Sequence, residues 1–191
     1  MKITMNEISK LSLGSQILGC GGGGDFNEGL STAIEAIGKG EVELITMEEL
    51  KARGEDGIVV TISGVGSPAS EEAYYSTDVY PVIVDSLREK VEQKIIGFIA
   101  CEIGASSTFE PFIPAALLGV PVIDAPCDGR AHPLGVMGAL GLEKTGETVW
   151  QAAAGGKKEN HKYLELVVSG SVESASNLVR NAASEAGGAV A

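Results

Sequence analysis

Apolar segments alternate with amphipathic segments along the chain. Short runs rich in β-branched residues predict strands within residues 57–68, 94–104 and 120–126, and the first of these is expected to be a buried central strand. Apolar residues at helical spacing predict helices at 5–18, 26–38, 78–93 and 110–118. This alternation predicts an α/β fold with a mostly parallel sheet flanked by helices.

The remaining segments complete this prediction. Asn6 is the expected N-cap of the first helix, and residues 42–50 predict a strand followed by a short helix. The helix at 26–38 is expected to bury one face, formed by Leu30, Ala33, Ile34 and Ile37. After residue 141 we expect a polar linker around 155–158, a strand at 162–169 and a helix at 171–186 that begins at Ser171. The expectation is a single Rossmann-like three-layer domain over residues 1–191, with a C-terminal strand–helix extension.

Composition and charge restrict the possible partners. The 191 residues are 44% hydrophobic and 21% charged, which is typical of a soluble globular domain. Fourteen Lys and Arg against 26 Asp and Glu give a net charge of −12. A chain this acidic repels nucleic-acid phosphates and anionic lipid, so we expect neither nucleic acid nor membrane as a partner.

The cysteines and the first residues favour a cytoplasmic protein. The first 14 residues lack the apolar core of a signal peptide, and no window is apolar enough for a transmembrane helix. The three cysteines are Cys20, Cys101 and Cys127, an odd number that favours free thiols in a reducing compartment. Neither a CxxC nor an HxxxH spacing occurs, which argues against a structural zinc site of the usual kind.

Binding residues in parallel sheets lie just past the carboxyl ends of the strands. That rule selects three segments, at 63–67, 101–107 and 124–132. In the second, Glu102 could be a general base or ligand, or could bond to loop amides. Cys101 is expected to be a small buried hydrophobe, and Ser106 either binds substrate or caps the next helix.

The densest group of reactive side chains lies between residues 124 and 133. Arg130 can hold a planar anion with two hydrogen bonds. Asp128 and His132 could form an acid–base pair or help to hold a metal, and Cys127 would be nucleophilic if a neighbour lowered its pKa. The alternative is a loop held by an internal Asp–Arg pair. His161, in a charged stretch, is expected to be a solvated surface residue.

A run of nearly bare glycine occupies residues 19–24. Glycine lets backbone N–H groups approach a ligand closely, and a helix that starts just afterwards adds a partly positive end. The run is not a Walker A motif, because no Lys-Ser/Thr follows, and it is not a clean dinucleotide fingerprint. The alternative is a tight turn beneath another backbone segment. Asp25 is expected to cap the following helix, a role compatible with ligand binding.

Two of these segments together resemble one family. LGCGGGGD (18–25) is similar to the LGtGGGGD signature of the DUF917 proteins, also called the S-methyl-thiohydantoin desulfurase family. VPVIDAPCDGRAHPLGVMGALGL (120–142) resembles that family's G-x-P-V-x-D-a-x-x-x-G-R-A-x-P block. The Glu102-x-Gly104 segment and residues 170–191 also match in order.

The resemblance implies an N-terminal α/β domain and a connection to hydantoin-type rings. Genes of the family often lie beside hydantoinase-like genes, and one activity in the family is hydrolytic removal of sulfur from a thiohydantoin. Family members usually carry a second, mostly β domain that is expected to be absent here. The chain would then be a separate subunit, a truncated protein or a minimal member. Cys20 in place of the usual Thr, and Pro126-Cys127-Asp128 in place of Asp-Gly-Met, point to a different substrate.

We therefore expect a cytoplasmic enzyme, or an enzyme subunit, that hydrolyses a hydantoin- or thiohydantoin-like cyclic amide as its small-molecule substrate. The residues expected to bind substrate are Gly21, Gly22, Gly23, Gly24, Asp25, Ser106 and Arg130. The residues expected to move protons or activate water are Glu102, Cys127, Asp128 and His132. A divalent metal such as Zn or Mn, held by Asp, His and Cys127, is compatible with this set.

Other classes of function remain open. The main alternative is a non-catalytic subunit that binds a small ligand within a larger hydantoinase-like complex, either with a partner chain or as a homo-oligomer. A dinucleotide-dependent oxidoreductase fits less well, because the acidic residue that would hold the adenine ribose is not visible in the sequence.

Overall fold

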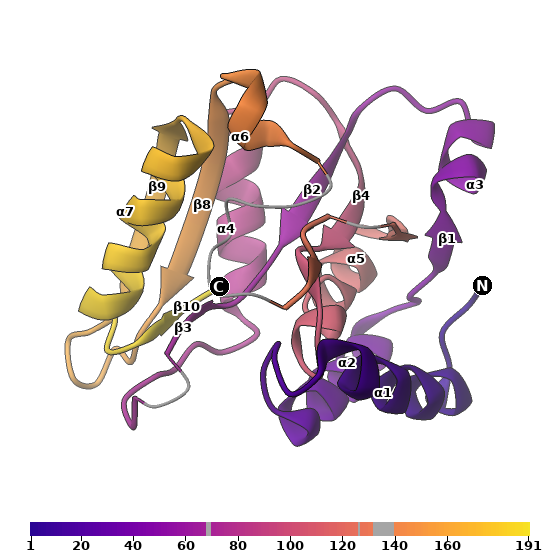
Figure 1. Cartoon of the computed structure of the whole chain (residues 1–191), viewed down its shortest axis with the longest axis horizontal. Coiled ribbons are helices and arrows are strands. Elements are labelled where there is room, and N and C mark those ends of the chain that lie inside the picture. Colours follow the sequence, from indigo (N-terminus) through magenta and orange to yellow (C-terminus); the bar gives the residue numbers. More distant parts are fainter. Residues whose placement is uncertain (68–69, 126, 132–139) are drawn as a thin grey trace. The chain divides into compact units, whose positions relative to one another are not determined.

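The computed structural model describes residues 1–67, 70–125, 127–131 and 140–191. The chain forms two compact units (Figure 1). The first unit contains Met1–Ser63 and Gln93–Leu140, and the second contains Gly64–Glu92 and Gly141–Ala191.

A four-stranded parallel sheet is the centre of the first unit. Its strands run in the order β1 (Leu44–Thr46), β6 (Val122–Asp124), β4 (Ile95–Ala100) and β2 (Ile58–Ile62). This sheet confirms the predicted α/β class. The predicted central place of β2 is wrong, because it pairs only with β4 within the described sheet and most of its residues are half-buried.

Helices cover this sheet and one another. They are α1 (Met5–Gly19), α2 (Phe26–Lys39), α3 (Met47–Ala52) and α5 (Phe112–Leu118), with a 3-10 turn at Ser107–Phe109. Helix α3 contacts β1 and β6, and α5 contacts β4. Helix α2 packs against α5, and α1 lies beside α2 (Figure 1). Helix α2 buries Ala33 as predicted but exposes Ile34, since Gly29 and Ala36 complete its buried side.

The ends of α1 are set by local hydrogen bonds. Thr4, and not the predicted Asn6, is the N-cap: the Thr4 hydroxyl accepts a hydrogen bond from the Asn6 amide at 3.3 Å. Asn6 already lies in the first turn, so it supplies the amide that is capped. At the other end, Cys20 adopts the left-handed conformation with φ of 52° and leads into the glycine run.

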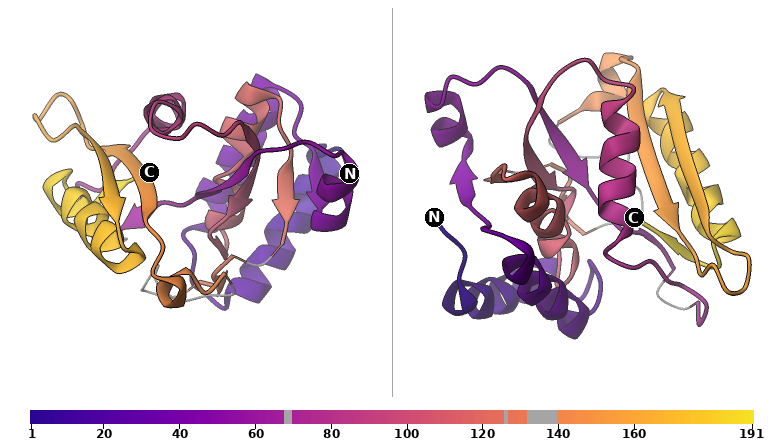
Figure 2. Two further views of the ribbon diagram at one scale, coloured as in Figure 1. Left: turned by 90° about the horizontal axis from the view of Figure 1, so that it is seen from above. Right: turned by 180° about the vertical axis from the view of Figure 1, so that it is seen from behind.

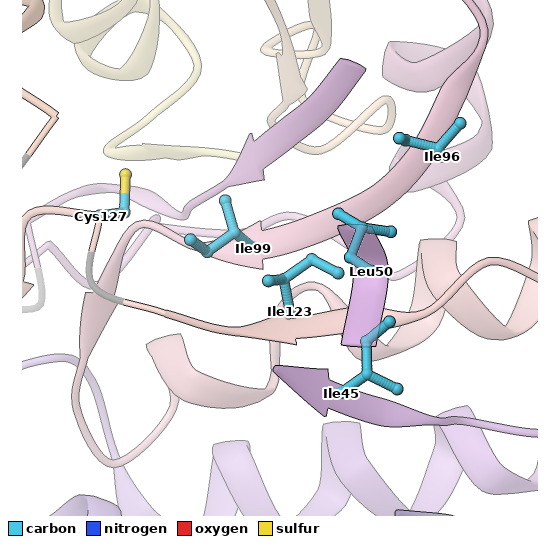
Figure 3. Packing of buried hydrophobic residues seen from close by; sticks show 6 residues of the cluster. All are labelled: Ile45, Leu50, Ile96, Ile99, Ile123 and Cys127. Atoms are coloured by element: carbon cyan, nitrogen blue, oxygen red, sulfur yellow. The ribbon is translucent and has the colours of Figure 1, made fainter. Parts of the chain in front are cut away.

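A buried apolar cluster joins α3 to the sheet. Its members come from β1, α3, β4, β6 and the segment after β6, namely Ile45, Leu50, Ile96, Ile99, Ile123 and Cys127. Figure 3 shows Cys127 at one end of this cluster, beyond the carboxyl ends of β4 and β6. The core therefore reaches the edge of the sheet at which a binding site is expected.

The second unit is built around an antiparallel hairpin, visible in both views of Figure 2. Strands β8 (Val149–Gly155) and β9 (Leu164–Gly170) pair along their whole length, and α4 (Val79–Arg88) and α7 (Val172–Glu185) pack on them. A short antiparallel pair, β3 (Val65–Gly66) with β10 (Ala189–Val190), and helix α6 (Leu142–Thr145) complete the unit.

The C-terminal strand and helix agree with the sequence prediction, whereas β8 was missed. Ser171 caps α7 as predicted, accepting a hydrogen bond from the Ser174 amide at 3.2 Å. Gly155, expected in a polar linker, instead ends β8. No helix among the described residues combines the length and apolar character needed to cross a membrane.

Candidate functional site

Two short strands bring two predicted loops together in the first unit. Strand β5 (Glu102–Ile103) follows β4, and β7 (Gly129–Arg130) follows β6, and the two pair in parallel. The Asp128 amide donates to the Cys101 carbonyl at 2.7 Å, which extends this pairing by one bond. The segments 101–107 and 127–131 therefore form one continuous edge beyond the main sheet.

At this edge two thiols and a carboxylate converge. The Cys101 thiol donates a hydrogen bond to Asp128 Oδ2 at 3.0 Å. The Cys127 Sγ atom lies 3.9 Å from Asp128 Oδ1 and 3.5 Å from the Thr61 hydroxyl. The Sγ atoms of both cysteines and a carboxylate oxygen of Asp128 all lie within 4.8 Å of one another. We call these three residues the thiol–carboxylate cluster.

The two thiols differ in how readily they ionise. A hydrogen bond with Cys127, burial and the neighbouring Asp128 carboxylate all raise the pKa of Cys101. The neighbouring Cys101 thiol lowers the pKa of Cys127 against the opposing effect of burial, and the Thr61 hydroxyl lowers it further by a smaller amount. Cys127 is thus the better thiolate, and Cys101 keeps its proton as a donor.

The structure of this segment differs from one expectation and from one alternative interpretation of the sequence. Cys101 was predicted to be a small buried hydrophobe, but it is half-buried and bonded to Asp128. No ion pair between Asp128 and Arg130 occurs among the described residues, so the alternative interpretation, a loop held by an internal pair of these two residues, is wrong. The cluster could not be predicted from the sequence, because Cys101 and Cys127 lie 26 positions apart.

Arg130 links this edge to the glycine run. Its exposed guanidinium donates from Nη1 to the Cys20 sulfur at 3.2 Å. Cys20 is therefore placed beside Arg130, whereas the thiol–carboxylate cluster contains the other two cysteines. An exposed guanidinium can still present its other donors to an anion.

The glycine run packs tightly against the segment after β5. The Gly23 carbonyl accepts hydrogen bonds from the Ser106 amide at 2.7 Å and the Ser107 amide at 2.9 Å. A Cβ at Gly23 would lie 2.4 Å from the Gly104 Cα atom, and a Cβ at Gly24 would lie 2.5 Å from the Ser106 Cβ atom. The expected alternative, a tight turn beneath another backbone segment, is what these contacts describe.

Two other glycines of the run differ in their surroundings. A Cβ at Gly22 would lie 2.8 Å from the Ala131 Cβ atom, which ties the run to the segment after β7. Gly21 has φ of 88° and nothing within 4 Å of where its Cβ would lie. Gly21 is therefore the glycine of this run with space for a ligand beside its Cα.

Asp25 caps α2 as predicted. Its Oδ1 atom accepts hydrogen bonds from the Asn27 amide at 2.8 Å and the Glu28 amide at 3.2 Å. The amides that an anion would use at this helix start are thus already bonded to the protein's own carboxylate.

Replacing Asp25 by Ala is expected to lower the free energy of unfolding by about 1 kcal/mol, because two amides of the first turn of α2 lose their acceptor. Urea denaturation of the purified chain measures this change. Asp25→Ser, which keeps a capping oxygen, is the control and is expected to lose less than half as much. Equal losses in the two variants would contradict a capping role.

The other predicted site residues have varied surroundings. Ser106 precedes the 3-10 turn without a side-chain capping bond, so the expected hydroxyl cap is wrong. Glu102 is half-buried in β5, and its carbonyl accepts the Ser107 hydroxyl at 3.3 Å. His132 lies outside the described residues. His161 is exposed, as predicted.

Comparison with known proteins gives a family and a fold. The model of the family described as "S-Me-THD-like, N-terminal domain" matches residues 6–165. Among solved structures, the crystal structure of a protein from Chromobacterium violaceum is similar, with a TM-score of 0.72 and 20% sequence identity. The similarity covers 100% of this chain and 54% of that one, so this chain spans about half of that protein's length. A search of curated proteins gave no match.

Proposed function

The chain belongs to the S-Me-THD-like family, because the model of that family's N-terminal domain matches residues 6–165. We therefore propose that it acts hydrolytically on a hydantoin- or thiohydantoin-like cyclic amide. The family name indicates a role related to hydantoin and thiohydantoin metabolism. The observation that carries the catalytic part of the proposal is the thiol–carboxylate cluster of Cys101, Cys127 and Asp128. A cytoplasmic location belongs to the same proposal.

The position of the cluster supports a reaction centre. It lies past the carboxyl ends of β4 and β6, where parallel sheets bind their ligands. Cys127 is 4% exposed, while Cys101 and Asp128 are half-buried. A substrate can thus reach the carboxylate and one thiol from solvent, with the second thiol held beneath them.

The proposed reaction on a thiohydantoin balances with water alone. The oxygen of water bonds to the ring carbon that carries sulfur, and the carbon–sulfur bond breaks. The oxygen remains as a carbonyl, and sulfur leaves as hydrogen sulfide with the two protons of the water. In a hydantoin, the corresponding ring carbon carries oxygen in place of sulfur. Attack of water on that carbon would break a carbon–nitrogen bond of the ring, and the nitrogen would take a proton.

The residues at this edge have proposed roles in the reaction. Asp128 takes the proton of the attacking water, and the Cys101 thiol, bonded to Asp128, orients the carboxylate. Cys127 lies beneath the same carboxylate, 3.9 Å from Asp128 Oδ1, and helps to orient it. Arg130, beside the glycine run, holds an anionic substituent of the ring.

The remaining predicted residues also have roles in this proposal. Gly21 leaves space for the ring, with Gly22, Gly23 and Gly24 fixing the loop and Asp25 fixing the helix behind it. Ser106 offers a hydroxyl to the substrate, and Glu102 and His132 serve as further proton carriers.

The test is sulfide release from a 2-thiohydantoin that carries a propionate side chain, measured beside ring opening of the matching hydantoin. Purified wild-type chain and Cys127→Ser are compared under reducing conditions. We expect sulfide release by the wild type and at least a ~100-fold lower rate for the variant. Circular dichroism of Cys127→Ser serves as the folding control.

Absence of turnover on both rings would contradict an enzyme and favour the alternative, a small-ligand-binding subunit of a larger complex. Saturable binding of the thiohydantoin by the inactive chain, measured by calorimetry, would identify that case. Turnover by Cys127→Ser at the wild-type rate would show that the Cys127 thiol takes no part in the reaction.

A further inference from the structure

We propose that Cys101, Cys127 and Asp128 bind one divalent zinc ion through two sulfur atoms and one carboxylate oxygen. The ion would share the site of the proposed hydrolysis, but the binding itself does not depend on that activity. Two cysteines and one acidic residue supply a donor set that zinc accepts in proteins.

The spacing of the three donor atoms fits a small metal ion. All three lie within 4.8 Å of one another, and the Cys101 sulfur is 3.0 Å from Asp128 Oδ2. Zinc–sulfur bonds of about 2.3 Å at tetrahedral angles place two sulfurs about 3.8 Å apart. Shifts of about 1 Å or less, within the range of side-chain rotation, bring the donors to that geometry.

The backbone around the donors is held by sheet pairing. Cys101 lies between β4 and β5, and Asp128 directly precedes β7, which pairs with β5. The Asp128 amide donates to the Cys101 carbonyl at 2.7 Å, so these two ligands are fixed to each other by a backbone bond. Cys127 is anchored in the apolar cluster beneath the sheet. The donors therefore need little ordering when the metal binds.

The number of donors leaves a coordination position open. Structural zinc sites use four protein ligands, whereas catalytic sites use three and keep the fourth for water or substrate. The half-buried Cys101 and Asp128 give that position access to solvent. In the context of the proposed function, the fourth ligand would be the attacking water or the sulfur of the thiohydantoin, and the Asp128 oxygen that does not bind zinc would take the proton of the water.

Binding is accompanied by proton release. As each zinc–sulfur bond forms, the thiol gives up its proton to the buffer, so a site with two neutral thiols releases up to two protons. The ion carries two positive charges against two thiolates and one carboxylate. The loaded site keeps one net negative charge.

The experiment measures zinc binding by the purified, fully reduced chain, with zinc chloride as the probe. Isothermal titration in buffers of different ionisation enthalpy gives the affinity, the stoichiometry and the protons released. Cobalt(II) substitution adds a spectroscopic readout, because thiolate–cobalt bonds give charge-transfer absorption in the near ultraviolet. Cys101→Ser is the main variant, since Cys101 is half-buried. Cys20→Ser, which removes the cysteine outside the cluster, is its matched control.

We expect one zinc ion per chain for the wild type and for Cys20→Ser, with proton release and a cobalt–thiolate band. Cys101→Ser is expected to raise the Kd for zinc by at least about 100-fold, and Asp128→Asn to raise it less. Failure of the reduced wild type to bind zinc, or an unchanged affinity in Cys101→Ser, would overturn the proposal. Zinc binding without turnover would contradict only the proposed function. Turnover unaffected by a chelator, with no zinc bound, would contradict only this inference.

Discussion

Asp128→Asn is expected to lower the rate of sulfide release from the thiohydantoin by about 10²–10⁴-fold, the usual contribution of a general base. The amide keeps the size and shape of the carboxylate but cannot take a proton from water. It can still accept the hydrogen bond from Cys101, which is 3.0 Å from Asp128 Oδ2 in the wild type. The expected loss therefore reports proton transfer rather than a collapsed loop.

The matched control for this prediction is Asp124→Asn. Asp124 ends β6 and is exposed, and it undergoes the same chemical change four positions before Asp128. We expect turnover by Asp124→Asn within about twofold of the wild type, since the change removes one exposed charge that the solvent screens. Steady-state rates at matched substrate concentrations provide the comparison. Equal losses in the two variants would mean that the net charge of this edge, and not Asp128 as a base, sets the rate.

Gly23→Ala is expected to lower the free energy of unfolding by about 2–5 kcal/mol, a large part of a typical domain's stability. Gly23 has φ of 76°, a conformation that costs an L-residue about 1–2 kcal/mol. Its added Cβ would lie 2.4 Å from the Gly104 Cα atom and 2.6 Å from the Ser107 Oγ atom. Relieving that overlap must separate two backbone segments joined by bonds to the Gly23 carbonyl.

Gly21→Ala separates the cost of the positive φ from the cost of close backbone packing. Gly21 has φ of 88°, so it carries the same conformational cost, but nothing lies within 4 Å of its added Cβ. We expect a loss of about 1–2 kcal/mol at Gly21, measured by urea denaturation beside Gly23→Ala. Similar losses at the two positions would show that close backbone packing adds nothing to the conformational cost.

Much of the fold could be predicted from the order of apolar segments. Buried parallel strands produce continuous β-branched runs, and those at 94–104 and 120–126 became β4 and β6. Strand position was not predictable in the same way. β2 has an equally apolar sequence but lies at the edge of the described sheet, because position within a sheet depends on tertiary pairing.

The missed hairpin strand has a different cause. Strand β8 contains three consecutive alanines, Ala152–Ala154, which carry little strand preference by themselves. Two of them are buried against the rest of the second unit. Packing, rather than local preference, makes that segment a strand.

The candidate site was predicted in part. The segment 124–132 stood out because five reactive side chains lie within it, and Asp128 and Cys127 were among them. Cys101 was not predicted as a site residue, because a thiol at the end of an apolar strand is usually a small buried hydrophobe. Its partnership with Asp128 arises from the pairing of β5 with β7, two residues each, which no local pattern indicates.

The rate of sulfide release by Cys101→Ala tests most directly whether the cluster is the reaction centre, since only its spatial position assigns Cys101 to the site. We expect a rate at least about 100-fold below the wild type, with circular dichroism unchanged. A wild-type rate in this folded variant would show that the cluster is not the reaction centre and that Cys101 is a packing residue.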